Sequence, residues 1–199
     1  MLKLIYPALF ALFCQITPVH AFDINPLGYI KDAVEAAVED RSSSDIGKDA
    51  KIKASIVSTI TDKMGSDVIS VSTDVYEQDV LLTGVVETNK QKQQAGNIAT
   101  SIKGVKKVYN DIIVHKKTDK DKGAVEGFVD DTVIEKKINA LLLEGKGVNV
   151  TNFRWRSVGG HVFLFGRALS KAELSKAIKI VKGIKGVARV TSRVKVKAK

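Results

Sequence analysis

Residues 79–108, DVLLTGVVETNKQKQQAGNIATSIKGVKKV, decide the fold, because residues 161–190, HVFLFGRALSKAELSKAIKIVKGIKGVARV, repeat their pattern. The two stretches align without a gap at an offset of 82 positions. The landmarks that coincide are Gly84 with Gly166, Thr88 with Ser170, Gly104 with Gly186 and Val108 with Val190. Such a repeat predicts two domains of the same fold in tandem. Domains of roughly 70 residues rarely enclose a deep cleft, so the repeat favours binding or scaffolding over catalysis.

The first helix of each repeat is indicated by apolar residues at helical spacing. In the first repeat we expect the helix to begin after Asp49, with one buried stripe. The stripe residues are Ile52, Ile56 and Ile60 in the first repeat and Ile134, Ile138 and Leu142 in the second. Two alternating strands follow, joined by the turn 77–79 in the first repeat and by Gly159-Gly160 in the second.

A second helix follows the strands in each repeat. Its start is predicted by a capping box at equivalent positions, Thr88-x-x-Gln91 and Ser170-x-x-Glu173. Gly104 and Gly186 suit the left-handed conformation that ends helices. Alternation resumes in a third strand, over residues 105–114 and 187–196.

The predicted fold class is α+β, with two αββαβ domains. Each domain is expected to be a three-stranded mixed sheet with two helices on one face, because a helical crossover makes the second and third strands parallel. The place of the third strand, beside the first or the second, is left open. The helix-free face of the second sheet would carry Phe163 and Phe165, with Arg154 and Arg156 beside them. We expect that face to pack against the other domain or the N-terminal segment.

The N-terminus is typical of a secretory signal peptide. Lys3 precedes an apolar run, and Val19-His20-Ala21 forms a cleavage site of small-residue type. The predicted divisions are a signal peptide at 1–21, an N-terminal segment at 22–46, domains at 47–116 and 128–199, and a linker at 117–127. Cys14 raises the alternative of a lipoprotein, which Phe13 disfavours because that position usually holds a small residue.

Basic residues are concentrated in the second repeat. Residues 124–199 carry 16 basic and 6 acidic side chains, whereas residues 47–118 carry 11 and 8. Basic domains usually bind nucleic acid or anionic membranes. Because export removes contact with nucleic acid, the charge favours phospholipid headgroups or acidic envelope polymers.

The sequence contains no convincing pattern for an enzyme or a metal site. With cleavage after Ala21, the mature chain keeps only His115 and His161 and has no cysteine, so the usual zinc ligand sets are not available. No G-x-S-x-G elbow and no phosphate-cradling glycine loop is present. We therefore predict a protein without catalytic residues, metal or cofactor.

These landmarks resemble the BON domain of bacterial envelope and osmotic-stress proteins. The resemblance rests on Gly84 and Gly166 after a strand, on the capped helix, and on the closing segments KGVKKVYNDI and KGVARVTSRV. It covers about residues 49–116 and 131–198. The lead-in EDRSSSDIGKDAKIK is similar to that of dual-BON envelope proteins in particular. This implies a periplasmic protein, peripheral to the outer membrane, that binds anionic phospholipid and supports envelope integrity. Such relatives are typically lipoproteins and tend to carry an aromatic residue where this chain has Val133.

A candidate lipid-binding face lies on the first helix of the second repeat. On a helical wheel, one cluster lies opposite the buried stripe and is partly apolar. The candidate residues are Val133, Lys136, Lys137, Ala140 and Leu143. Apolar groups beside lysines suit contact with a membrane interface, and the first repeat has Thr61 where the second has Leu143. The alternative is that this face packs on the first domain.

Two functional classes remain. One is a non-enzymatic envelope protein whose partners are an anionic phospholipid surface and, in addition, other envelope proteins. The other is a soluble osmotic-stress protein of the periplasm that binds protein partners in a chaperone-like way. Monovalent-cation binding, a role of some single-BON proteins, has no carboxylate cluster to support it.

Overall fold

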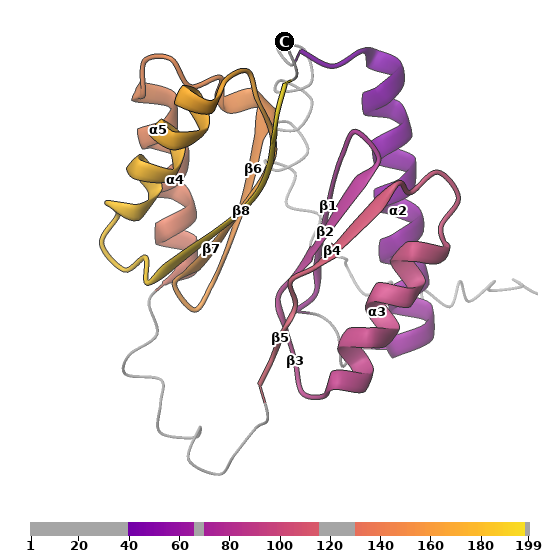
Figure 1. The fold of residues 1–199 in the computed structure, drawn as a ribbon. Coiled ribbons are helices and arrows are strands. Elements are labelled where there is room, and N and C mark those ends of the chain that lie inside the picture. The colour runs from indigo at the N-terminus through magenta and orange to yellow at the C-terminus, as the bar shows by residue number, and fades with distance from the viewer. Residues whose placement is uncertain (1–39, 66–69, 116–129, 198–199) are drawn as a thin grey trace, which may run out of the picture.

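The computed structural model describes residues 40–65, 70–115 and 130–197 (Figure 1). The predicted signal peptide, Cys14, residues 22–39 and the predicted linker lie outside the described residues. The elements of the first domain are α2 (Ser43–Met64), β1 (Ser72–Tyr76), β2 (Asp79–Thr83), β3 (Val85–Val86), α3 (Asn89–Ser101), β4 (Lys107–Asn110) and β5 (Ile113–Val114). Those of the second are α4 (Asp131–Glu144), the 3-10 helix η3 (Val150–Asn152), β6 (Phe153–Val158), β7 (His161–Ala168), α5 (Lys171–Lys182) and β8 (Arg189–Val196). The predicted α+β class and the predicted order of helices and strands are confirmed.

The two main sheets have the same topology, with strand orders β1-β2-β4 and β6-β7-β8. In each sheet the first two strands form an antiparallel hairpin, and the third runs parallel to the second. The third strand therefore lies beside the second, which the sequence left open. In the first domain this strand is divided, because β4 pairs with β2 whereas β5 pairs with β3.

The repeated glycine of the second strand is required by a close approach of two backbones. Gly84 and Gly166 have φ values of 109° and 110°. A Cβ atom would lie 1.8 Å from the carbonyl oxygen of Ser70 at Gly84, and 2.1 Å from that of Asn152 at Gly166. No side chain fits at either distance, so this landmark of the repeat is steric in origin.

The first helix of the first domain begins earlier than predicted. Ser42 caps α2, and its hydroxyl accepts a hydrogen bond from the amide of Asp45 at 3.1 Å. Asp49, where we expected the start, lies inside the helix and accepts from the amides of Glu77 and Gln78 at 2.7 and 2.8 Å. These donors form the turn of the β1–β2 hairpin, so this aspartate joins the helix to the hairpin.

The predicted capping boxes hold in one domain only. In α3 both bonds of the box between Thr88 and Gln91 are present. In α5 the Ser170 hydroxyl accepts from the amide of Glu173 at 3.1 Å, but the returning bond is absent. The buried Glu173 carboxylate accepts instead from the amides of Leu169 and Asn149, at 2.5 and 2.6 Å. It thereby ties the start of α5 to the loop after α4.

The landmark glycines after the second helices do not serve as caps. The C-cap residues are Ile102 and Gly183, so α3 and α5 end before Gly104 and Gly186. Both glycines nevertheless have positive φ values, 96° and 99°. They form the turns that lead into the third strands.

The two domains pack sheet against sheet. In Figure 1 the sheets face each other at the centre, and the helices cover the two outer sides. Each domain has an apolar core between its helices and its sheet. A third cluster fills the space between the sheets, with Tyr76, Leu81, Phe163 and Phe165 buried at its centre. The expectation that the helix-free face packs against the other domain is therefore confirmed.

The domains are related by an approximate two-fold axis that runs through this interface. Arg156 binds Asp74 with nitrogen–oxygen distances of 3.1 Å, and Arg193 binds Asp111 at 2.8 Å. In both pairs the partners occupy equivalent positions of the two repeats. A residue meets its own equivalent only near a two-fold axis. At these positions the charges are opposite, so each acid of the first domain faces a base of the second.

Candidate functional site

Helix α4 presents one buried side and one exposed side. Its start is capped by the Asp130 carboxylate, which accepts from the amides of Thr132 and Val133 at 3.0 and 3.3 Å. The buried side consists of Ile134, Ile138 and Leu142, as predicted. The helix therefore has the orientation that the hydrophobic pattern indicates.

The five candidate residues lie together on the exposed side of α4. Val133, Lys136, Lys137, Ala140 and Leu143 are all exposed. Leu143 exposes 62% of its surface and Val133 exposes 42%. Among the described residues nothing covers this side, so the alternative of packing on the first domain is not observed.

The structure adds an apolar residue that the helical wheel missed. Leu141 exposes 40% of its surface, although the wheel places it next to the buried Ile134. Its equivalent in the first domain is Thr59, a polar residue at the same position of the repeat. In the ranges that the structure describes, the large exposed apolar side chains are Val133, Leu141, Leu143, Leu169 and Val196. All five belong to the second domain, and three belong to α4.

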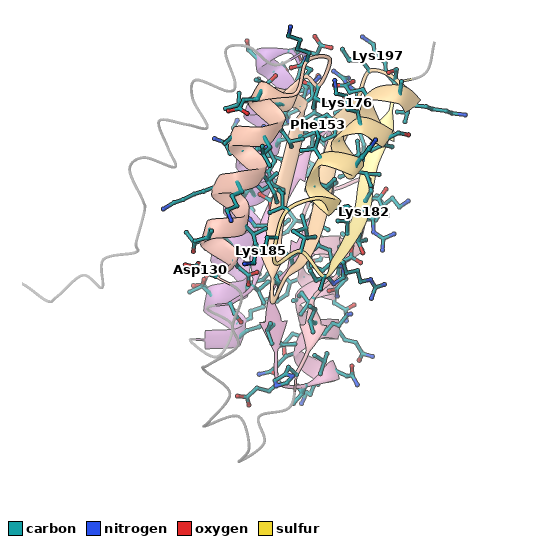
Figure 2. The ribbon with its side chains drawn as sticks, turned by 90° about the vertical axis from the view of Figure 1, so that its left-hand side faces the viewer. Asp130, Phe153, Lys176, Lys182, Lys185 and Lys197 are labelled. Carbon is teal, nitrogen blue, oxygen red and sulfur yellow. The ribbon has the colours of Figure 1, made fainter. Side chains whose placement is uncertain are left out.

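Exposed lysines surround this apolar group. The exposed lysines of α4, α5 and the adjoining loops are Lys136, Lys137, Lys146, Lys171, Lys176, Lys179, Lys182 and Lys185. In Figure 2, which shows the outer side of the second domain, α4 and α5 lie side by side; Lys176 and Lys182 are labelled at α5, and Lys185 near Asp130. The ammonium group of Lys176 donates to the carbonyl of Lys146, which joins α5 to the end of α4. The outer side of the second domain is therefore basic around an apolar centre.

Potential metal ligands do not gather in the described ranges. These ranges contain no group of three side chains suited to holding a metal ion. His161 binds the hydroxyl of Thr191 through Nε2 at 2.8 Å, and its ring lies 4.0 Å from that of Phe163. Burial lowers the pKa of His161, which keeps the ring neutral and suits a packing role. None of the helices in these ranges has the length and the apolar run that crossing a bilayer requires.

The geometry agrees with the match to a protein family. The model of the BON domain matches residues 48–116 and 130–198, which among the described elements include both main sheets, most of α2, and α3, α4 and α5. The chain therefore belongs to the BON-domain family and carries the domain twice.

Curated relatives include proteins from three bacteria. An uncharacterised protein in the gshII 5′ region of Anaplasma centrale is 36% identical over 128 residues, which cover 64% of this chain and 82% of that protein. The osmotically inducible protein Y of Escherichia coli is 33% identical over 148 residues, covering 74% and 70% of the two chains. A 21 kDa hemolysin of Actinobacillus pleuropneumoniae is 25% identical over 171 residues, covering 86% and 78%.

Proposed function

We propose that this chain is a non-enzymatic periplasmic protein that binds anionic phospholipid through the exposed side of α4 and supports the integrity of the outer membrane. The observation that carries the proposal is the gathering of exposed apolar side chains on α4, beside exposed lysines. Membrane-surface helices combine these features, because the apolar groups enter the acyl boundary while the lysines attract headgroups.

The charges on this side suit reversible recruitment. A basic residue near an anionic leaflet contributes about 1 kcal/mol, so three or four lysines give a useful but reversible attraction. Screening acts over about 8–10 Å at 0.1–0.15 M salt, so binding should weaken as the salt concentration rises. The first domain lacks the apolar part of this surface, since Thr59 and Thr61 replace Leu141 and Leu143.

The test is liposome flotation of the mature protein with and without anionic lipid. We expect binding only with anionic lipid, and we expect Leu143→Asp to reduce it about tenfold or more, because a carboxylate then faces the acyl boundary. Leu143 is exposed, so the circular dichroism spectrum and thermal midpoint should stay close to those of the wild type. Lys136→Glu combined with Lys137→Glu should weaken binding through charge.

Thr61→Asp is the matched control, because Thr61 occupies the equivalent position of the first domain. It should leave liposome binding unchanged. Equal binding by the wild type and Leu143→Asp, or loss of binding in Thr61→Asp alone, would contradict the proposed surface.

A second candidate function is osmotic-stress protection through protein partners. It is favoured by the similarity to the osmotically inducible protein Y. Absence of binding to any liposome, together with suppression of aggregation of a test protein, would favour this function over the first.

A further inference from the structure

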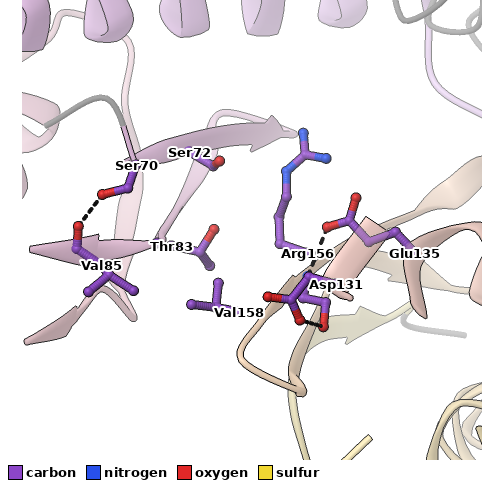
Figure 3. A pocket seen from close by; sticks show the side chains of 10 residues that line it. Ser70, Ser72, Thr83, Val85, Asp131, Glu135, Arg156 and Val158 are labelled. Atoms are coloured by element: carbon purple, nitrogen blue, oxygen red, sulfur yellow. Dashed lines mark hydrogen bonds between the residues drawn. The ribbon is translucent and has the colours of Figure 1, made fainter. Parts of the chain in front are cut away.

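A cavity of about 310 Å³ lies between the two domains, beside the end of the β6–β7 hairpin. Its walls come from both domains, as Figure 3 shows. The lining residues that matter here are Thr83 and Val85 of the first domain and Asp131, Glu135, Arg156 and Val158 of the second. The cavity lies away from the exposed side of α4, so it is distinct from the proposed lipid-binding surface.

The two-fold relation between the domains gives this cavity a counterpart on the other side of the interface. Each lining residue has an equivalent in the other domain, 82 positions away in the sequence, and these equivalents line the counterpart. Asp131 corresponds to Asp49, Val158 to Tyr76, and Val85 to Arg167. Ser70, which also lines the cavity, corresponds to Asn152.

The counterpart is filled by two residues of the chain's own lead-in, Asp40 and Arg41. The guanidinium of Arg41 pairs with the Asp49 carboxylate at 2.5 Å and lies over the ring of Tyr76, 4.0 Å from its centroid. The Arg41 side chain is only 5% exposed. Asp40 donates its amide to Asn152 at 3.4 Å, and its carboxylate lies 3.9 Å from the guanidinium of Arg167. The fold thus accommodates an arginine of the segment that leads into α2 at this position.

Asp131 in the cavity is equivalent to Asp49, which binds Arg41 in the counterpart. Asp131 accepts from the amides of Gly159 and Gly160 at 2.6 and 3.0 Å, as Asp49 accepts from its own hairpin. Its Oδ2 atom, bound by Gly159, keeps a lone pair for a further donor, and Asp49 Oδ2 uses the same capacity for Arg41.

Two carboxylates in the cavity can accept hydrogen bonds from a cation. Glu135 stands where the first domain has Lys53, which adds a second carboxylate. Burial raises the pKa of Glu135, and the charge of the nearby Arg156 opposes that rise only in part. Arg156 also lines the cavity, but it pairs with Asp74 at 3.1 Å as well, so one guanidinium is shared between Asp74 and the cavity carboxylates.

A buried hydroxyl in the cavity lacks a partner. Thr83 is fully buried, and its Oγ1 atom has no hydrogen-bond partner among the described residues. Figure 3 shows Thr83 facing the same space as Arg156 and Asp131. Buried hydroxyls are nearly always satisfied, so this atom indicates an occupant with a hydrogen-bonding group.

We propose that the cavity binds the guanidinium group of an arginine presented by a segment of another protein. The arginine would pair with Asp131 and Glu135, as Arg41 pairs with Asp49, and its polar atoms would lie within reach of Thr83. The second domain's own lead-in has Lys122-Gly123 where the first has Asp40-Arg41, so the chain supplies no arginine of its own at this position.

The test uses the full mature chain and NMR chemical shifts of backbone amides. The probe is an acetylated and amidated peptide that copies residues 38–44 with alanine in place of Asp40, because Val85 replaces the arginine that Asp40 binds. We expect it to shift the amides of Ser157, Gly159 and Gly160 at millimolar concentration. The same peptide with citrulline in place of arginine should not shift them. Free L-arginine should act at least about tenfold more weakly, because it lacks the backbone of the segment.

Two variants change the affinity in opposite directions. Glu135→Gln keeps an acceptor for Ser157 but removes a charge, so it should weaken the peptide about threefold or more. Val158→Tyr restores the ring that Arg41 covers in the counterpart, so it should tighten binding about threefold. Glu144→Gln, an exposed change on the same helix, is the control and should have no effect.

Equal shifts with arginine and citrulline would overturn the proposal, as would shifts confined to Glu77 and Gln78 at the filled counterpart. Binding that appears only after Lys122→Ala would assign the cavity to the chain's own linker and would also overturn it. Liposome binding should be the same for Glu135→Gln and the wild type, so this test is independent of the proposed function.

Discussion

At the scale of single residues, two aspartates hold the hairpins in place. Asp49 and Asp131 project from the first helix of each domain and accept from backbone amides of the hairpin turn. In the first domain the turn residues Glu77 and Gln78 have positive φ values of 53° and 64°, an uncommon conformation outside glycine. The Asp49 carboxylate accepts hydrogen bonds from the amides of this turn. In the second domain the equivalent turn consists of Gly159 and Gly160, which adopt positive φ values readily.

His161 makes the stability of the second domain depend on pH. Burial lowers its folded-state pKa below the ordinary value of 6.5, so the unfolded chain binds the proton more readily. Its contribution to stability is therefore present above pH 6.5 and is lost as the pH falls through the folded-state pKa. We expect urea unfolding, followed by the fluorescence of Trp155, to show lower stability at pH 5.5 than at pH 7.5. In His161→Gln the difference should be smaller, and an unchanged difference would contradict the assignment.

At the scale of helices and strands, the starts of α3 and α5 use equivalent residues differently. Gln91 completes an exposed capping box, whereas Glu173 is buried and accepts from amides of two separate segments. The sequence predicted a capping box both at Thr88 and Gln91 and at Ser170 and Glu173, because the motif specifies only the local spacing of the two residues. The second partner of Glu173, Asn149, lies 24 residues away, and no local pattern indicates it.

This difference predicts unequal costs of truncation. Gln91→Ala should lower the free energy of unfolding by less than about 1 kcal/mol, because water can replace an exposed acceptor. Glu173→Ala leaves two amide donors without their acceptor and should cost about 2–3 kcal/mol. Urea unfolding monitored by circular dichroism measures both. Equal costs would show that the bonds of Glu173 add nothing beyond a cap.

The helices also show how far the sequence could predict the candidate site. The spacing of Ile134, Ile138 and Leu142 predicted which side of α4 is buried, and the five candidate residues are exposed. Leu141 was missed because it lies about 20° from Ile134 on a wheel of 100° per residue. A helical wheel describes one helix alone, so it cannot show whether neighbouring elements are long enough to cover Leu141.

At the scale of the whole molecule, the two domains form an interface whose charges are inverted about the two-fold axis. The duplicated pattern predicted each domain, since every repeat encodes its own core. It did not predict the pairing of Asp74 with Arg156 or of Asp111 with Arg193. These partners are 82 positions apart, and they come together only when the two folded domains pack. The cavity between the domains was missed for the same reason.

The inverted charges predict that the interface can be broken and restored. Asp111→Arg places two arginines together, which should weaken the association about tenfold or more, since like charges at an interface cost several kcal/mol. Arg193→Asp should act similarly, and the double exchange should restore the association. The measurement is co-elution of the two halves after cleavage at a protease site placed in the linker 117–127. Failure of the double variant to recover would contradict the pairing.

The inverted charges also bear on how the chain is made. The first domain is synthesised before the second, and until then its sheet face with Leu81 and Tyr109 lacks the cover that the second domain provides. Two unfinished chains that met through this face would bring Asp74 against Asp74 and Asp111 against Asp111 near the axis. Repulsion between these carboxylates disfavours such an encounter, whereas Arg156 and Arg193 of the second domain attract them. Each chain therefore distinguishes its own second half from its neighbours' first halves, which protects a duplicated protein from pairing with itself before it is complete.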